Sequence, residues 1–216
     1  MKKAIRLLAF FIPLMFISCD EHEKVVIDTN LYIGQILCSD GSVVDYNKLD
    51  TATHTPVGVV FSTNNEGTRY SGRGYAVLLK ESGRFAFADS LGYQQHTNTS
   101  MTEYAGFSNT YSMYISASPL ASSLMISFPT WQSAFIPSVA EMRELYAAKS
   151  IINPILESLG GDILPVNSED GYYWTSTEVA GQETLQAYTY STSAAQILPA
   201  LKEIPYKTRP VVIIYE

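Results

Sequence analysis

The chain has 216 residues, of which 46% are hydrophobic, 12% aromatic and only 16% charged, and its formal net charge is −7. The hydrophobic fraction is too high for a disordered chain, and the low charged fraction requires a surface built from uncharged polar side chains. The negative balance, with no Lys/Arg cluster beyond the first residues, argues against a nucleic-acid partner.

The first 19 residues have the pattern of a targeting segment. Lys2, Lys3 and Arg6 form a positive start, and residues 7–17 form an apolar stretch too short to span about 30 Å of hydrocarbon as a permanent helix. The stretch closes on Phe16-Ile17-Ser18-Cys19, which resembles a bacterial lipoprotein box. The alternative is an ordinary secretory signal with a chance cysteine.

The lipoprotein resemblance implies a signal peptide over residues 1–18, a lipid on Cys19 and a tether over residues 19–31. The chain is then held to a membrane through acyl chains on one residue. The acidic residues after the cysteine resemble the export signal of lipoproteins displayed on the outer face of the outer membrane, although Asp20 resembles an inner-membrane retention signal in other lineages. We expect an outer-membrane protein displayed on the cell surface, with an orientation toward the periplasm as the alternative.

Residues 32–216 are expected to form a single domain that begins with strands. Residues 34–38 and 42–44 flank Asp40-Gly41, and an Asp-Gly pair between apolar runs is a strong hairpin signal. Further strands are expected at residues 56–61, 75–79 and, more weakly, 84–88.

Residues 89–130 carry repeated Ser, Thr, Asn, Gln and Tyr with weak periodicity, which predicts long surface loops. The clear helical signal follows. Ser138 and Glu141 match a capping box at a helix start. Asn153-Pro154 predicts the start of a second helix, and Gly160-Gly161 its end.

The C-terminal third returns to strands, at residues 172–177, 184–190 and 209–215. Strands, then helices, then strands, without βαβ alternation, indicate an α+β fold with a mainly antiparallel sheet.

An ordered set of short motifs resembles a known family. Its members are Trp131, Ile136-Pro137-Ser138, Glu141-Met142, Leu145-Tyr146, Ile152-Asn153, Leu159-Gly160-Gly161, Tyr173-Trp174-Thr175-Ser176-Thr177-Glu178 and Arg209-Pro210-Val211. The set resembles the C-type-lectin-like domain of lipoproteins from gut-type bacteria and is similar to the variable proteins of diversity-generating retroelements. The resemblance covers roughly residues 32–216. It implies a C-type-lectin-like fold of small, mainly antiparallel sheets, two helices and long irregular loops.

The resemblance also implies site residues. Glu178 and Arg209 are expected to form a structural ion pair that ties the 172–178 segment to the last strand. In retroelement-diversified relatives, the region before the final strand displays the ligand-binding residues.

Carried over to this chain, that region supplies Gln186, Tyr188 and Tyr190 as ligand-binding candidates, with Tyr104 and Tyr111 as a second set in another Tyr-rich stretch. Tyrosines among small polar residues suit a binding surface. Alternate tyrosines in a strand are equally consistent with a packed core face.

No catalytic residue is predicted. The distantly similar formylglycine-generating enzymes use a cysteine pair, whereas a lipid on Cys19 leaves only Cys38 as a free thiol here. Cys38 lies in an apolar run and is expected to be a buried small hydrophobe. The histidines at 22, 54 and 96 have no ligand spacing and are expected to be solvated.

No metal and no cofactor are predicted either. The calcium-binding tripeptides of true C-type lectins are missing from the sequence. Asp162, Glu169 and Asp170 could gather around a cation, but a solvated acidic loop is the simpler interpretation.

The sequence therefore predicts a surface-anchored, non-enzymatic, metal-independent module that binds an unidentified protein or glycan. The alternative is a structural or assembly subunit of a cell-surface complex or fibre. An exposed edge strand or a large apolar patch would favour that alternative.

Overall fold

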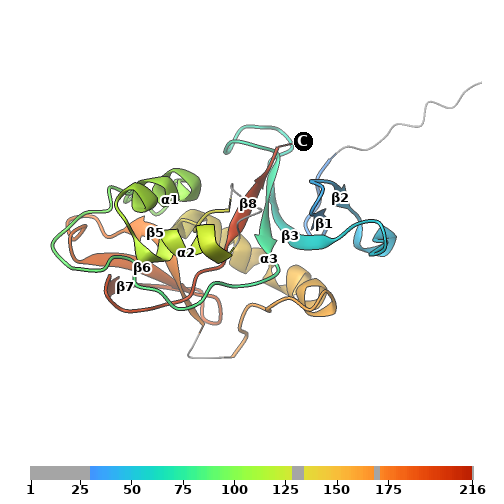
Figure 1. Ribbon diagram of the computed structural model, residues 1–216. Coiled ribbons are helices and arrows are strands. Elements are labelled where there is room, and N and C mark those ends of the chain that lie inside the picture. Colours follow the sequence, from blue (N-terminus) through green and yellow to red (C-terminus); the bar gives the residue numbers. More distant parts are fainter. Residues whose placement is uncertain (1–29, 128–133, 168–170, 216) are drawn as a thin grey trace, which may run out of the picture.

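The computed structural model describes residues 30–127, 134–167 and 171–215, which form two antiparallel sheets and three α-helices (Figure 1). The larger sheet has the strand order β2 (Val43–Val44), β1 (Ile36–Cys38), β3 (Pro56–Thr63), β4 (Gly74–Leu78), β8 (Val211–Ile214). The smaller sheet has the order β5 (Tyr172–Glu178), β6 (Gln186–Ser191), β7 (Gln196–Leu201). The helices are α1 (Gly106–Ile115), α2 (Pro119–Ser127) and α3 (Val139–Ser158), and a 3-10 turn spans Tyr46–Lys48. The α+β prediction is confirmed.

The Asp-Gly hairpin is confirmed between β1 and β2. Gly41 takes a φ of +85°, a left-handed conformation that glycine adopts without strain. The N–H of Cys38 donates to the carbonyl of Ser42 at 2.9 Å and closes the turn. Strands β3 and β4 match two of the predicted runs. The weaker strand at 84–88 is wrong, because Phe85 forms only an isolated bridge with Tyr206.

Helix α3 begins where the capping box predicts. The backbone N–H of Ser138 donates to the Glu141 carboxylate at 2.6 Å. The prediction of a second helix from Asn153 is wrong, because α3 runs on through Pro154 as one helix. The Asn153 side chain instead bonds both backbone groups of Leu164, at 2.8 and 2.9 Å, so it holds a later loop rather than capping a helix.

The prediction of loops over residues 89–130 is wrong for its second half, which contains α1 and α2. Two helices were expected in the chain, and the described residues contain three. Helix α2 did have a local signal. The Ser118 hydroxyl accepts the N–H of Ala121 at 3.3 Å, and Pro119 is the first helical residue, which is an N-cap followed by a proline where a proline is tolerated.

Strand β7 was not predicted. It pairs with β6 from Ser191–Gln196 to Gln186–Leu201 and is the edge of the smaller sheet. Its side chains are mostly exposed, and Pro199 stands in its middle. Because exposed side chains and a proline both weaken the strand signal, the sequence pattern does not reveal an edge strand of this kind.

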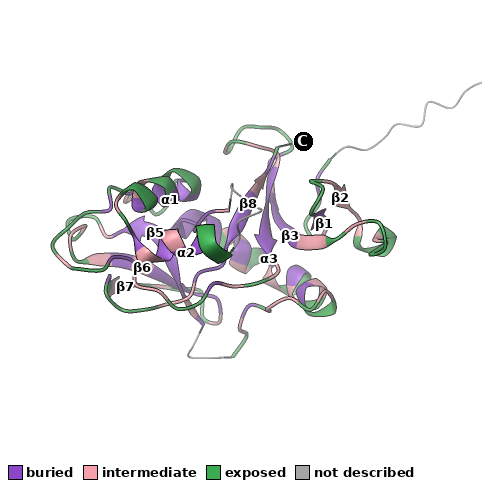
Figure 2. Ribbon diagram, viewed as in Figure 1, coloured by how far each residue is buried: buried purple, intermediate pink, exposed green. Residues whose placement is uncertain are grey.

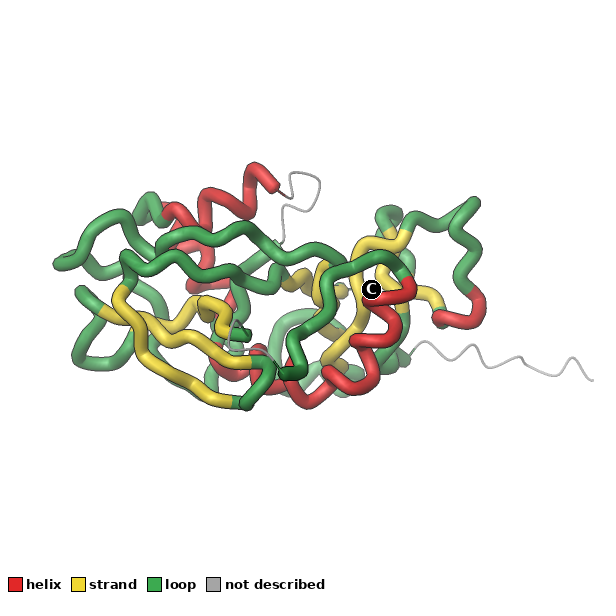
Figure 3. The backbone as a smooth tube through the Cα atoms, turned by 90° about the horizontal axis from the view of Figure 1, so that it is seen from below, coloured by secondary structure: helices red, strands yellow, loops and turns green. Residues whose placement is uncertain are grey.

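The buried residues lie mostly in the strands and on the faces of the helices that pack against them (Figure 2). One core cluster joins α3 to the larger sheet, with Leu145, Ile152 and Val59 among its members. A second cluster, around Trp174, joins α1 and α2 to the smaller sheet. Hairpin β1–β2 and the smaller sheet lie at opposite ends of the molecule (Figures 1 and 3). In the described ranges, no helix combines the length and the apolar character needed to cross a membrane.

Candidate functional site

Helix α1 has a reversed polarity. Its solvent side carries Phe107, Tyr111, Tyr114 and Ile115, with Tyr111 64% and Ile115 67% exposed. Positions i, i+4, i+7 and i+8 share one face of a helix, so these four side chains form one apolar stripe. Scattered exposed apolar residues are common, but a contiguous apolar face on a soluble domain indicates a surface that contacts something.

The inner side of α1 carries the polar residues Asn109 and Thr110 beside the apolar Met113, and its polar groups are satisfied. The Asn109 side chain accepts the N–H of Asn98 at 2.7 Å. The Thr110 hydroxyl donates to the carbonyl of Gly106 and accepts the N–H of Ile136, both at 2.8 Å. These bonds fix α1 against two neighbouring segments without burying its aromatic residues. The orientation of α1 is therefore set by these hydrogen bonds together with the burial of one large apolar side chain, Met113, in the core cluster around Trp174.

Glu141 joins α3 to the start of α1. Its fully buried carboxylate accepts the N–H of Ser138 and, at 3.3 Å, the N–H of Gly106. Burial raises the pKa of Glu141 to about 7, and the nearby charge of Glu144 acts in the same direction. Position 106 has no room for a side chain, because a Cβ there would meet the Glu141 carboxylate and lie 2.7 Å from the Phe135 ring.

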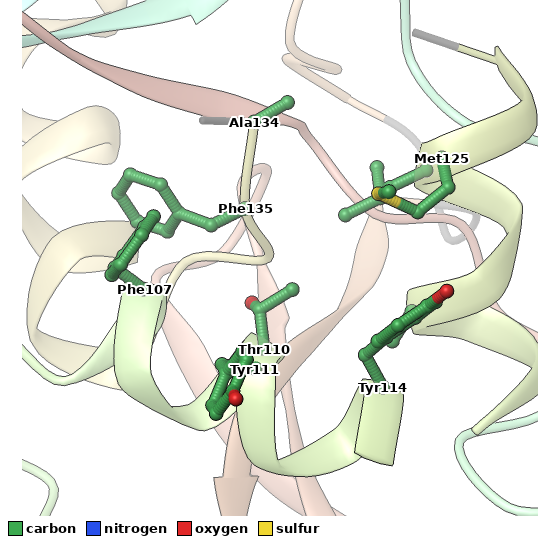
Figure 4. Close-up of a pocket in the computed structure, with 9 residues that line it drawn as sticks. Phe107, Thr110, Tyr111, Tyr114, Met125, Ala134 and Phe135 are labelled. Atoms are coloured by element: carbon green, nitrogen blue, oxygen red, sulfur yellow. The ribbon is translucent and has the colours of Figure 1, made fainter. Parts of the chain in front are cut away.

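A hollow of about 210 Å³ opens between α1 and α2 beside the apolar stripe (Figure 4). We call it the aromatic groove; it is lined by Phe107, Thr110, Tyr111, Tyr114, Ala121, Leu124, Met125, Ala134 and Phe135. The rings of Phe107 and Phe135 meet edge to face, with centroids 6.2 Å apart. Next to the groove, α2 exposes Ile126 at 81%. The apolar surface therefore extends across both helices.

A second hollow, of about 380 Å³, adjoins the first at Phe107. We call it the polar hollow; it is lined by Arg69, Tyr70, Ser71, Tyr75, Glu103, Tyr104, Phe107, Ser108, Ile213 and Tyr215. The rings of Tyr70 and Tyr75 stack with centroids 4.0 Å apart, and Tyr104 lies 5.1 Å from Tyr70. Since Phe107 lines both hollows, they form one continuous aromatic surface.

The carboxylate of Glu144 organises the polar hollow. It accepts hydrogen bonds from Arg69, from Ser62 and, at 2.5 Å, from the Tyr104 hydroxyl. The Arg69 guanidinium also lies 5.6 Å from the ring centres of Tyr70 and Tyr104, within the range of cation–π attraction. Burial raises the pKa of Tyr70 to about 12, so its hydroxyl stays neutral. The hollow therefore presents tyrosine rings fixed by stacking and hydrogen bonds, together with the half-exposed guanidinium of Arg69.

The structure separates the predicted ligand-binding residues. Tyr111 lines the aromatic groove and Tyr104 the polar hollow, so the second set lies on one surface. Gln186, Tyr188 and Tyr190 lie on β6 and line neither hollow.

Tyr190 is a core residue, since it is 3% exposed and its ring is 6.2 Å from that of Tyr146. The packed-core interpretation therefore holds for Tyr190. Gln186 and Tyr188 are half-buried.

The predicted ion pair between Glu178 and Arg209 is wrong. Glu178 pairs instead with Lys202, and both side chains are fully buried. The Glu178 carboxylate also accepts the N–H groups of Gln95 and Thr97, at 2.7 and 3.0 Å. The pair thus ties the loop around residue 95 to β5 and to the end of β7. Lys202 follows the unpredicted edge strand, so its position opposite Glu178 could not be foreseen.

Arg209 lies elsewhere in the core, where its guanidinium donates to the carbonyl of Leu78 at 3.1 Å. Burial lowers the pKa of Arg209, and the charges of Tyr173, Glu81 and Asp162 oppose that effect. Arg209 therefore helps to join the start of β8 to the end of β4, its neighbour in the sheet.

The acidic cation candidates and the lipidation candidate lie only partly within the described residues. Asp162 accepts the N–H of Glu81 at 3.0 Å and a bond from Lys80 at 3.3 Å, so its carboxylate holds a loop. Glu169 and Asp170 lie outside the described residues, as does the lipidation candidate Cys19.

No protein-family model matches this chain, and no curated protein matches it. A search of solved structures finds a fimbrial protein from Bacteroides ovatus, with a TM-score of 0.63 and 18% sequence identity. The match covers 84% of this chain and 48% of the fimbrial protein, so the chain spans about half the length of that structure. At this identity the likeness shows the fold, and the C-type-lectin-like assignment stays a prediction.

Proposed function

We propose that this chain is a non-enzymatic structural subunit of a cell-surface fibre or complex and that its aromatic groove receives a neighbouring subunit. The observation that carries the proposal is the reversed polarity of α1. The helix is held by Asn109, Thr110 and Met113 on its inner side, and the exposed rings of Tyr111 and Tyr114 add little to its stability. Aromatic side chains are the ones that contribute most to protein interfaces.

The apolar face is a better assembly surface than the exposed edge strand. An added strand needs a continuous row of backbone donors and acceptors, and Pro199 in the middle of β7 has no N–H. The other edge of the smaller sheet is covered, since Trp174 donates its N–H to the carbonyl of Lys207 at 2.8 Å. We therefore place the subunit contact on α1 and α2.

The likeness to a fimbrial protein supports this proposal over an isolated receptor. It is a likeness of fold to half of that protein, and we extend it to the role of a surface subunit. The predicted lipid on Cys19 completes the proposal, because a fibre needs an attachment to the outer membrane.

Site-specific photocrosslinking on the cell tests the subunit contact. A photoreactive phenylalanine analogue at position 111 should give discrete crosslinked bands that contain this chain and a second polypeptide. The same analogue at Tyr93, which is as exposed but lies outside both hollows, is the matched control. Uncrosslinked chain at position 111 under conditions where other surface proteins crosslink would contradict the proposal.

The anchor is tested separately by labelling cells with an alkyne fatty acid. We expect label on the wild-type chain and none on Cys19→Ala, together with release of the variant from the membrane fraction. Label that persists in Cys19→Ala would place the lipid elsewhere or show that the band is a contaminant.

A second function is favoured by the polar hollow. Arg69 above two tyrosine rings, beside hydroxyls held by Glu144, suits a polar ligand such as a glycan bound without metal. A glycan array probed with the chain in chelator tests it. Binding that is lost in Arg69→Gln and kept in Arg84→Gln would favour this function, whereas no binding leaves the assembly role as the better explanation.

A further inference from the structure

Three metal-ligating side chains from separate parts of the sequence meet at the hairpin end of the molecule. Cys38 ends β1, Asp40 begins the β1–β2 turn, and His54 precedes β3. One ligand atom from each, the Cys38 sulfur, an Asp40 carboxylate oxygen and a ring nitrogen of His54, lie within 4.8 Å of one another. The sequence shows no short metal-binding spacing here, because Asp40 and His54 are 14 positions apart.

The backbone holds these positions without help from the three side chains. Cys38 pairs with Pro56 across β1 and β3, and the N–H of Ser39 donates to the carbonyl of Thr55 at 2.8 Å. On the other side, Gly41 donates to the carbonyl of Cys38 at 3.0 Å. The carriers of the three ligands are therefore fixed by sheet and turn hydrogen bonds.

The side chains are also oriented toward a common point. One carboxylate oxygen of Asp40 accepts the N–H of Ser42 at 3.0 Å and its hydroxyl at 2.6 Å. The other oxygen faces Nδ1 of His54 at 3.1 Å. The carboxylate is thus held by its turn, and the oxygen directed at the histidine is the one left for a cation.

The three side chains of the cluster differ in how far they are buried. Cys38 is fully buried, whereas the side chains of His54 and Asp40 are about one third and one half exposed. A fully buried thiol cannot reach a substrate, so a nucleophilic Cys-His-Asp arrangement does not fit. Because the three ligand atoms lie within 4.8 Å of one another, a cation bound by the two outer ligands needs only a local rearrangement to bind the sulfur as well.

We propose that Cys38, Asp40 and His54 bind a zinc ion. Thiolate, imidazole and carboxylate are the protein ligands that zinc uses, and three of them with a fourth position for water make a tetrahedral site. In such a site the ligand atoms lie about 3.5 Å apart, so the present arrangement needs to close by about 1 Å. A thiolate and a carboxylate together neutralise the charge of Zn²⁺, which suits a site that is partly buried.

The zinc ion would fasten the β1–β2 turn to the segment that enters β3. It is independent of the proposed assembly role, because the hairpin lies at one end of the molecule, apart from α1 and α2 (Figure 1). A zinc clamp at that end would stiffen a short hairpin whose second strand has only two residues.

Cobalt substitution tests the site on the full chain carrying Cys19→Ser, which removes the only other thiol. Co²⁺ should give the thiolate-to-cobalt charge-transfer band and the intense visible absorption of a tetrahedral ion. Zinc should displace it at one ion per chain. Removing a ligand should weaken zinc binding at least about tenfold, since even outer residues of zinc sites have effects of that size.

Three variants make the result decisive. Cys38→Ser should lose the charge-transfer band, and His54→Gln and Asp40→Asn, which change partly exposed side chains, should fold and bind zinc more weakly. His96→Gln, an exposed histidine far along the chain, is the matched control and should bind as the parent does. A folded parent without the charge-transfer band, or zinc affinity equal in parent, His54→Gln and Asp40→Asn, would overturn the proposal.

Discussion

Helices α1 and α3 lie on the same molecule and follow opposite rules. Helix α3 buries an apolar face that includes Met142, Leu145 and Ile152, so its amphipathic pattern and its packing agree. Helix α1 buries Asn109 and Thr110 beside one large apolar side chain, Met113, and exposes its aromatic residues. The difference teaches that the apolar face of α3 serves the stability of the domain, whereas the outer face of α1 contributes little to it and is available for the contact proposed above.

The largest expected effect is in the core face of α3. Leu145→Ala should lower the free energy of unfolding by about 2–5 kcal/mol, because it leaves a cavity at a fully buried position. Urea unfolding followed by circular dichroism measures this. A loss below about 1 kcal/mol would mean that Leu145 does not pack α3 against the larger sheet.

Glu141, which joins the two helices, should make stability depend on pH. Its folded pKa of about 7 lies above the ordinary value of 4.5, so the folded state holds a proton that the unfolded state has released. Stability should therefore fall as the pH rises from about 4.5 to 7, by on the order of 3 kcal/mol at most.

Glu141→Gln has no proton to lose, so the difference between its unfolding free energy and that of the parent should shrink or change sign as the pH rises through this window. Urea unfolding of both proteins at several pH values measures the difference. A constant difference would show that Glu141 does not titrate in this range.

Gly106→Ala tests the junction from the side of α1. Alanine is the better helix former by about 1 kcal/mol, yet its Cβ would meet the Glu141 carboxylate and the Phe135 ring. We expect a net loss of about 1–3 kcal/mol, as for overpacking elsewhere. Stabilisation in a thermal melt would show that the junction yields easily, and Gly92→Ala, in open space at positive φ, separates crowding from backbone strain.

The smallest effect on stability belongs to the outer face of α1. Tyr111→Ser should change the free energy of unfolding by no more than about 0.5 kcal/mol, since the side chain is mostly exposed. The same variant should reduce incorporation of the chain into high-mass surface complexes, measured by native electrophoresis of solubilised membranes. If the double variant Tyr111→Ser, Met125→Ser forms the same complexes as the parent, the outer face of α1 is not the subunit contact.

Much of the fold follows from local signals. The Asp-Gly turn, the β-branched runs of β3 and β8, and the capping box at Ser138 each specify their own backbone through sterics and nearby hydrogen bonds. Helix α1 has no such signal, because Met113 is the one large apolar residue among its buried positions and its pattern suggests a loop. Strand β7 also lacks a local signal, because its side chains are mostly exposed and show no apolar alternation.

The candidate sites were less predictable than the fold. Tyr104 and Tyr111 were named from composition, but composition could not separate them from Tyr190, which has the same chemistry and lies in the core. Whether a tyrosine is exposed or buried depends on which side of its helix or strand is covered by the rest of the chain.

The sequence by itself determined the α+β class, the first hairpin and the start of the long helix, because neighbours in sequence supply the turn and capping bonds. Only the tertiary structure decided that Glu178 pairs with Lys202, that Phe107 joins two hollows, and that Cys38, Asp40 and His54 converge. These are meetings of residues distant in sequence. Which residues meet is decided by sheet register and helix packing. Both depend on the whole core, so these contacts have no characteristic spacing in the sequence.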